Sequence, residues 1–234
     1  MVVKFRHLDR LRGHTIFTSS LMSGSVVIDA GAHKGEFSLQ LTEKYGCSCY
    51  LVEANPMLAA ELPSSLKGTI NAALSDQDGI VKFSIEENLE ASQVISAPSV
   101  ELVDSKKGDE IVEIESMSLE TLLRRFHLSK IDLLKLDIEG AEFPLLSSVK
   151  GELLSSISQI TVEFHDFKPE FQGQQLYEKC RDRLVSLGFL CCPMSFRTHG
   201  DVLFLNVKHF PLSVLNQFLI QHIARWVLKL QQIL

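Results

Sequence analysis

The stretch VVIDAGAHKGEFSL, residues 26–39, decides the fold class. Its first half is a β-branched apolar run that carries Asp29 near its end, as expected of a strand buried on both faces. Gly31 and Gly35 follow, and glycine lets the backbone turn tightly and approach a ligand without a Cβ in the way. The next residues place apolar side chains four apart on one helical face: Phe37, Leu41 and Tyr45. The stretch therefore predicts a strand, a ligand-binding turn and a helix.

The same alternation continues along the chain. Further strands are predicted at 47–54, 69–76, 79–85, 110–118, 131–138, 157–165, 189–196 and 201–207, and helices at 57–66, 118–126, 140–149 and 175–188. Alternating strands and helices predict an α/β fold with a mostly parallel sheet and helices on both faces. Only RTHG, residues 197–200, joins the last two strands, so this pair is expected to be antiparallel. The polar segment 86–110 is expected to form a surface loop or lid.

The length and charge of the chain limit its organisation. With 234 residues and 45% hydrophobic content, it suits one sizeable domain over 26–210, preceded by a helical cap over 1–25 and followed by an amphipathic helix over 211–234. A net charge of −6 offers no general field for nucleic acid, and we expect no such partner. The basic segment KFRHLDRLRGH, residues 4–14, fits a solvated helix face better than a phosphate-binding arm.

The cysteines and the C-terminal tail indicate the cellular setting. Five cysteines with no CxxC spacing predict neither a disulfide framework nor a zinc site. Buried thiols, and an N-terminus without an apolar signal region, lead us to expect a cytoplasmic protein.

Polar residues interrupt the apolar C-terminal tail, and its helical stripe favours packing onto the domain or pairing in a homodimer over membrane contact. The stripe consists of Leu215, Leu219, Ile223, Trp226, Leu230 and Ile233.

Acidic residues end the first two predicted strands. Ligands of such sheets lie beyond the carboxyl ends of the strands. Asp29 ends the first strand, and Glu53, 24 residues later, ends the second, where a carboxylate can accept hydrogen bonds from both hydroxyls of a ribose. The dinucleotide pattern GxGxxG is absent, because His33 and Glu36 occupy its later glycine positions. S-adenosylmethionine carries an amino cation and no phosphate. Two acidic residues therefore suit it better than a dinucleotide, whose negatively charged pyrophosphate they would repel.

A second group of charged residues follows two later strands. LLKLDIEGAE, residues 133–142, places Lys135, Asp137, Glu139 and Glu142 around a strand end, and Glu163 and His165 share a face at the end of the next strand. Each residue alone could be structural, as an ion pair, a helix cap or a hydrogen-bonded histidine. Together they favour function, because solvated charges have no reason to gather at strand ends.

These motifs resemble the FkbM family of S-adenosylmethionine-dependent methyltransferases. The resemblance rests on VVIDAGAHKGEFSL, LVEANP, NAALSDQDG, IDLLKLDIEGAEFPLL and ITVEFH, and it runs from about residue 26 to residue 207. The pattern K-x-D-I-E-G-x-E, residues 135–142, is the most specific part. The resemblance implies a Rossmann-like class I methyltransferase fold, with a mostly parallel seven-stranded sheet and an antiparallel terminal hairpin. His33-Lys34 departs from the family, which commonly has Asn-Ile or similar there.

The resemblance also implies a set of site residues. Asp29, Gly31, Ala32 and Gly35 would cradle the methionine part of the cofactor, and Glu53 would bind its ribose. The adenine pocket would be lined by Asn71, Ala73 and Ser75. His33 and Ala54 complete the predicted cofactor-binding residues. Asp137 and Glu139 would face the reacting end of the cofactor.

The expected reaction is methylation of a hydroxyl of a sugar, glycan or small natural product. A hydroxyl becomes a good nucleophile when a general base removes its proton, and His165 is the first candidate for that base, followed by Glu139 and Asp137. A metal-free mechanism is favoured over one in which Asp137, Glu163 and His165 bind a metal, because their spacing is not diagnostic. The alternatives are a scaffold protein that keeps the fold without turnover and, less favoured, a nucleotide-dependent oxidoreductase.

Overall fold

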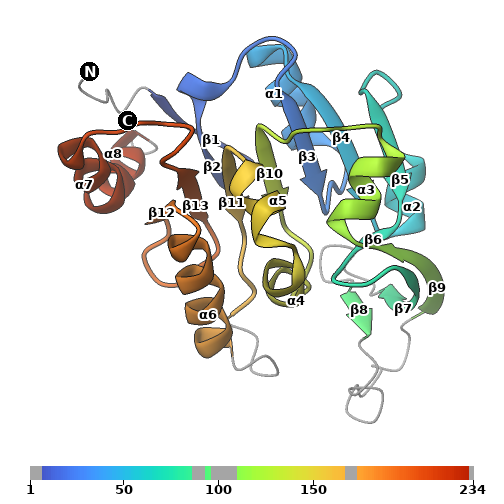
Figure 1. The fold of residues 1–234 in the computed structure, drawn as a ribbon. Coiled ribbons are helices and arrows are strands. Elements are labelled where there is room, and N and C mark those ends of the chain that lie inside the picture. The colour runs from blue at the N-terminus through green and yellow to red at the C-terminus, as the bar shows by residue number, and fades with distance from the viewer. Residues whose placement is uncertain (1–6, 86–92, 96–109, 167–172, 232–234) are drawn as a thin grey trace.

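A seven-stranded sheet forms the centre of the molecule (Figure 1). The computed structural model describes residues 7–85, 93–95, 110–166 and 173–231. Along the sheet the strands are β12 (Phe189–Pro193), β13 (Val202–Asn206), β11 (Gln159–Val162), β10 (Leu133–Leu136), β3 (Val26–Ala30), β4 (Ser48–Glu53) and β5 (Gly68–Asn71). Only β13 runs against its neighbours, on both sides. The predicted parallel sheet with an antiparallel terminal hairpin is therefore confirmed.

The chain reverses its direction of travel across the sheet at β3. From β3 it proceeds through β4 to β5 at one edge, and it later returns to β10 on the other side of β3. The register places Asp29 opposite Leu51 on β4 and opposite Lys135 on β10. A parallel sheet opens a crevice at such a switch point, so the ends of β3, β4 and β10 are where a ligand is expected.

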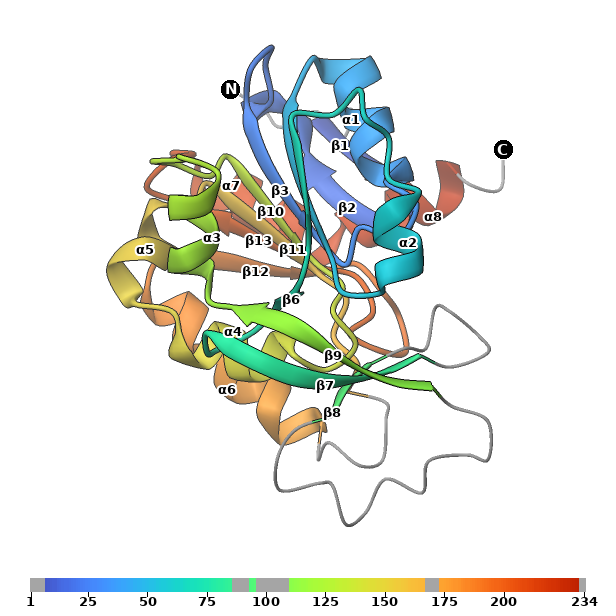
Figure 2. The ribbon, with the colours of Figure 1, turned by 90° about the vertical axis from the view of Figure 1, so that its right-hand side faces the viewer.

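Secondary structure covers both faces of the sheet, as predicted (Figures 1 and 2). One face packs against α3 (Leu119–Arg125), α4 (Glu142–Ser148), α5 (Gly151–Ser156) and α6 (Gly173–Ser186). The opposite face packs against α1 (Glu36–Tyr45), an N-terminal hairpin and α7 (Val214–His222). Side chains alternate between these layers along each strand: Phe204 joins the first core, whereas Leu203 and Leu205 join the second. α2 (Pro56–Ala60) follows β4.

The N-terminal segment is a β-hairpin, and the predicted helical cap is wrong for its described residues. β1 (Leu8–Leu11) pairs antiparallel with β2 (His14–Phe17). Arg12 and Gly13 form the turn with φ values of 46° and 90°, and a two-residue turn with positive φ suits the twist of paired strands. The hairpin is held to the sheet by Asp201, which accepts hydrogen bonds from the backbone and the hydroxyl of Thr15. Residues 1–6 lie outside the described part.

A second, four-stranded sheet was not predicted. It has the order β6 (Ala73–Leu74), β9 (Glu110–Met117), β7 (Gly79–Ile85), β8 (Gln93–Ile95). The segment 69–76, predicted as one strand, ends its pairing with β4 at Asn71 and then pairs with β9. The predicted lid over 86–110 lies outside the described residues except for the β8 backbone and Glu110, and 167–172 are also outside them.

The C-terminal tail forms two helices instead of the single predicted helix. α7 ends at His222 and α8 (Ala224–Gln231) follows. Ile220 and Ala224 are fully buried on the sheet, whereas Trp226 and Leu230 of the predicted stripe are exposed. The tail therefore packs onto the domain, as predicted, but through a different helical face from the predicted stripe. A homodimer through this tail stays a prediction. Of the described helices, none has the length and apolar character needed to cross a membrane.

All five cysteines are free and buried, and we expect none to react with a disulfide reagent in the native protein. Burial raises the pKa of Cys47 to about 11 and that of Cys49 to about 12, so both remain thiols at mildly alkaline pH. Counting modified thiols with a chromogenic aromatic disulfide, before and after adding denaturant, measures this. Five thiols should appear only after unfolding, and rapid modification of the folded protein would contradict the described burial.

Candidate active site

A cavity of about 340 Å³ opens at the carboxyl ends of β3, β4 and β10. Small-molecule sites typically measure about 300–1,000 Å³. The central sheet contributes the turn after β3, Glu53 at the end of β4 and Asp137 after β10. The second sheet contributes Leu74 and Phe83, so its apolar side chains form part of the wall. The cavity therefore lies at the switch point and combines one charged side with one apolar side.

The turn after β3 depends on Gly31. Its φ is +72°, and a Cβ at this position would lie 1.7 Å from the carbonyl oxygen of Asp137. The turn is held from the other side by Val52, whose carbonyl accepts hydrogen bonds from the amides of Gly31 and Ala32 at 3.0 and 3.2 Å. No side chain fits between these two strand ends, so glycine is required for close approach, as well as for its backbone conformation.

Glu53 fastens the same turn to the end of β4. One carboxylate oxygen accepts a hydrogen bond from the amide of His33 at 2.7 Å, and the other accepts one from the amide of Asn55 at 2.8 Å. Burial raises the pKa of Glu53 above its usual range, although both amide hydrogen bonds act in the opposite direction. His33 has a φ of 50°, which turns its amide toward the carboxylate. Each oxygen retains a lone pair for a ligand in the cavity.

Lys135 is a buried cation that joins three parts of the site. Its ammonium group donates a hydrogen bond to the carbonyl of Gly31 at 2.6 Å and lies 3.2 Å from Asp29 and 3.4 Å from Asp137. Asp29 is fully buried and also accepts a hydrogen bond from Ser38 at 2.7 Å. Burial acts to raise the pKa of Asp137, but Lys135 and His14 outweigh it and hold that pKa well below its usual range. Asp137 is therefore ionised and is a weak base.

The turn after Asp137 is built around Glu142. Glu139 and Gly140 have φ values of 54° and 106°, and the buried carboxylate of Glu142 accepts hydrogen bonds from the amides of Ile138 and Gly140. The ring of His165 lies between two carboxylates, with Nδ1 3.0 Å from Glu142 and Nε2 3.3 Å from Glu139. Burial lowers the pKa of His165, but these hydrogen bonds outweigh it and raise the pKa to about 10. Both nitrogens face carboxylates and the raised pKa favours the protonated ring at neutral pH, which argues against His165 as the general base; its role stays a prediction.

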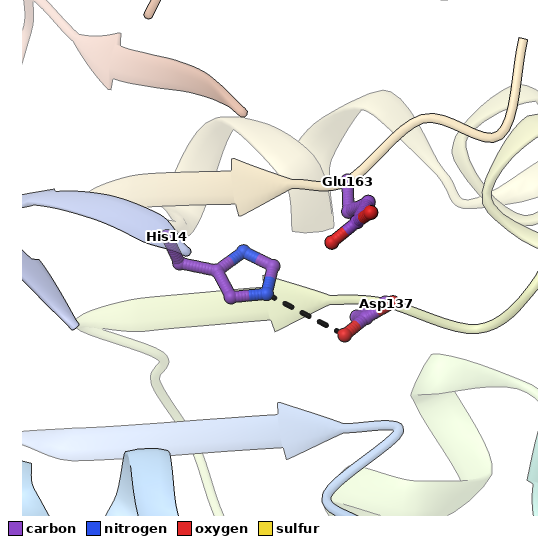
Figure 3. Close-up of side chains that lie close together, drawn as sticks. All are labelled: His14, Asp137 and Glu163. Atoms are coloured by element: carbon purple, nitrogen blue, oxygen red, sulfur yellow. Dashed lines mark ion pairs between the residues drawn. The ribbon is translucent and has the colours of Figure 1, made fainter. Parts of the chain in front are cut away.

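His14 of the N-terminal hairpin reaches the same strand ends (Figure 3). It is 1% exposed, and its Nε2 lies 3.5 Å from Asp137 Oδ2. Glu163 follows β11, and burial raises its pKa above the usual range, as does the neighbouring Asp137. A nitrogen of His14 and one oxygen each of Asp137 and Glu163 lie within 4.8 Å of one another. Two carboxylates and an imidazole therefore converge at this end of the cavity.

Comparison with known families identifies the domain. The model of the methyltransferase FkbM domain matches residues 29–191, which is well over half of the chain. The chain belongs to the FkbM methyltransferase family. Methyltransferase sdnD of Sordaria araneosa is 25% identical over 192 residues, covering 68% of this chain and 74% of its own. The family suspected from the sequence is thus confirmed.

Solved structures that resemble this FkbM domain are also methyltransferases. One is a precorrin-6y C5,15-methyltransferase from Geobacter metallireducens, with 12% identity, a TM-score of 0.39, and coverage of 80% of this chain and 82% of that one. Another is a TehB-like S-adenosylmethionine-dependent methyltransferase from Corynebacterium glutamicum, with 10% identity, a TM-score of 0.40, and coverage of 80% and 83%. The class I methyltransferase fold of the chain rests on its strand order and family.

The FkbM domain places most predicted site residues around the cavity. The cavity is lined by Gly31, Ala32, His33, Glu53, Ala54, Ala73, Asp137 and Glu139. Five others are not among its lining residues: Asp29, Gly35, Asn71, Ser75 and His165. Asp29 is turned toward Lys135, and Asn71 donates hydrogen bonds to the carbonyls of Glu53 and Ala54, so both support the cavity from behind. Direct contacts between any of these residues and a cofactor stay predictions.

Several lining residues of the cavity were not predicted, among them Arg12, His14 and Phe83, and the first two precede the residues that the family model matches. Arg12 pairs with Glu36 at 2.8 Å and is not part of a solvated helix. The dipeptide Arg12-Gly13 between two apolar segments could have indicated the hairpin that carries Arg12 and His14. Phe83 belongs to a predicted strand, but no local pattern shows that this strand joins a second sheet.

Proposed function

We propose that this FkbM-family protein transfers the methyl group of S-adenosylmethionine to a hydroxyl of a sugar, glycan or small natural product. The observation that carries the proposal is the cavity at the switch point, which is lined by Gly31, Glu53, Asp137 and Glu139. The family supports methyl transfer. The choice of a hydroxyl acceptor rests on the acidic cavity and on the resemblance noted from the sequence.

The residues of the cavity suit this cofactor. Gly31 leaves a space beside the Asp137 carbonyl that a Cβ would fill, which allows close approach to the backbone. Glu53 has free lone pairs for ribose hydroxyls, and Leu74 and Phe83 offer an apolar surface for a flat base. Asp137 and Glu139 place negative charge in the cavity. This charge stabilises a ligand that carries an amino cation and a sulfonium cation.

The protein's contribution to the reaction is alignment and charge. S-adenosylmethionine, when bound, supplies a methyl group on a positively charged sulfur, and its transfer to a hydroxyl leaves a neutral thioether and releases a proton. Glu53 and the Gly31 turn orient the donor, and Asp137 and Glu163 lie where an acceptor hydroxyl can be hydrogen-bonded. Phe83 and Leu74 exclude water from the apolar side. His165 positions Glu139 and Glu142 instead of removing the proton.

Replacing Glu53 with glutamine should weaken S-adenosylmethionine binding about 10–100-fold, because a hydrogen bond to a charged group contributes about 1.5–3 kcal/mol. Titration calorimetry with S-adenosylmethionine and S-adenosylhomocysteine measures the Kd of both. Glu43→Gln, an exposed residue of α1, is the matched control and should bind like the wild type.

Binding of NAD, measured in parallel, separates the remaining alternatives. Binding of NAD in preference to both sulfur compounds would favour the oxidoreductase alternative. Failure of the folded wild type to bind any of the three would contradict the proposal and favour a scaffold that keeps the fold without turnover.

A further inference from the structure

We propose that His14, Asp137 and Glu163 bind a divalent cation at the acceptor end of the cavity. The inference deepens the proposed function and rests on it, because the cation would hold the hydroxyl that becomes methylated. The three side chains come from β2, from the turn after β10 and from the end of β11, and Figure 3 shows the His14 ring directed toward both carboxylates. Their closest ligand atoms lie within 4.8 Å of one another, as around a single ion.

His14 gives the first independent indication of a missing ligand. The side chain is 1% exposed, and its Nδ1 has no hydrogen-bond partner within the described ranges of the chain. Its Nε2 lies 3.5 Å from Asp137, which is longer than an ordinary hydrogen bond. Leaving a buried polar atom unsatisfied costs about 1–3 kcal/mol. Neither ring nitrogen therefore makes an ordinary hydrogen bond, and in the tautomer that carries its proton on Nδ1 the lone pair of Nε2 is directed at the carboxylates and is available for a metal.

The charge around the cavity gives the second indication. Five carboxylates lie in one connected group: Asp29, Asp137, Glu139, Glu142 and Glu163. Lys135, His165 and His14 are the basic groups described in contact with them, and with His14 neutral, as a metal ligand must be, three negative charges remain even when the other two are cationic. A divalent cation together with the net positive charge of S-adenosylmethionine would balance this excess. Unbalanced charge of this size is costly in a half-buried site.

A neighbouring cluster of Asp137, Glu139 and His165 is the competing arrangement. Both ring nitrogens of His165 already lie against carboxylates, at 3.0 Å from Glu142 and 3.3 Å from Glu139. Its imidazole therefore has no lone pair directed at a metal, whereas His14 does. The two carboxylates suit hard divalent ions, and the imidazole favours a transition-metal ion such as Mn²⁺ over Mg²⁺.

The cation would replace the missing general base. A hydroxyl oxygen bound to a divalent cation loses its proton more readily, and the proton passes to solvent water. The oxygen then forms a bond to the methyl carbon as the carbon–sulfur bond breaks, and the electron pair of that bond stays on sulfur. This role agrees with the position of His165, whose two nitrogens already lie against Glu142 and Glu139.

Electron paramagnetic resonance of added Mn²⁺, after removal of metals with a chelator, tests the site without measuring turnover. We expect one Mn²⁺ per chain, at least about 10-fold weaker binding in His14→Ala and in the isosteric Glu163→Gln, and unchanged binding in His209→Ala, an exposed histidine. Circular dichroism establishes that each variant is folded, and Glu163→Gln decides the result if His14→Ala is not.

The failure of this inference can be distinguished from failure of the proposed function. Calorimetry with S-adenosylmethionine on the same metal-free protein reports cofactor binding separately. Cofactor binding with no stoichiometric Mn²⁺, or with Mn²⁺ binding that both variants leave unchanged, would overturn the metal site and leave the methyltransferase proposal intact. Stoichiometric Mn²⁺ binding that depends on His14 and Glu163, in a protein that does not bind S-adenosylmethionine, would support the site and contradict the proposed reaction.

Discussion

Replacing Gly31 with alanine is expected to lower the free energy of unfolding by about 4 kcal/mol and to abolish cofactor binding. The added Cβ would lie 1.7 Å from the carbonyl oxygen of Asp137 and 2.8 Å from its carbonyl carbon. These are backbone atoms of the adjacent strand end, so no side-chain rotation can relieve the clash. β3 and β10 would have to separate where the cavity begins. Urea unfolding followed by circular dichroism measures the loss.

Gly24→Ala is the matched control for this prediction. Gly24 also has a positive φ, of +83°, but a Cβ there would meet nothing within 4 Å. The control therefore carries the backbone strain alone, which costs about 1–3 kcal/mol, and it leaves the cavity intact. An equal loss of stability in both variants would show that Gly31 is required only for its backbone conformation, and not for close packing against Asp137.

The central sheet could be predicted because each of its strands carries a local pattern. Runs such as Val26–Ala30 are mostly apolar and almost fully buried, and helical spacing follows most of them. The antiparallel end of the sheet was predictable from chain length alone, because the residues between β12 and β13 are too few to cross over. Strand order was supplied by resemblance to a family, since local patterns do not specify which strands are neighbours.

The N-terminal hairpin could not be predicted with the same means. Its strands are only four residues each, and β2 is buried along its whole length because it packs against the sheet through distant residues. Thr15 meets Asp201 and Phe17 meets Gln159, contacts that span most of the chain. The role of His14 depends on these contacts. The same reason hides the second sheet, whose first strand β6 begins only one residue after β5 ends in the main sheet.

The site was predictable in its location and less so in its chemistry. Glu53 and the Gly31 turn follow from strand ends and glycine spacing, and the structure brings them to one cavity. The assignment of His165 as a base used the pKa of a solvated imidazole. Its actual partners, Glu142 and Glu139, are 23 and 26 positions away in sequence, and their hydrogen bonds to both nitrogens cannot be read from the sequence.

Replacing Lys135 with methionine is expected to lower the free energy of unfolding by about 3–5 kcal/mol, because breaking a buried ion pair leaves its partner charge uncompensated. Lys135 is 4% exposed and is the cation closest to the fully buried Asp29. Its loss also frees the Gly31 carbonyl, so the turn that lines the cavity should loosen. Chemical denaturation measures stability, and calorimetry with S-adenosylmethionine measures the effect on the turn.

Two further variants separate the buried charge from other effects of the Lys135 substitution. Lys44→Met removes an exposed lysine whose pair with Asp9 lies at the surface, and it should cost less than about 1 kcal/mol. Asp29→Asn, combined with Lys135→Met, removes the stranded carboxylate but keeps an oxygen that can accept the hydrogen bond from Ser38. We expect this double variant to recover about 1–3 kcal/mol relative to Lys135→Met alone. No recovery would mean that Lys135 stabilises the protein through the Gly31 carbonyl and Asp137, and that Asp29 is held by its other contacts.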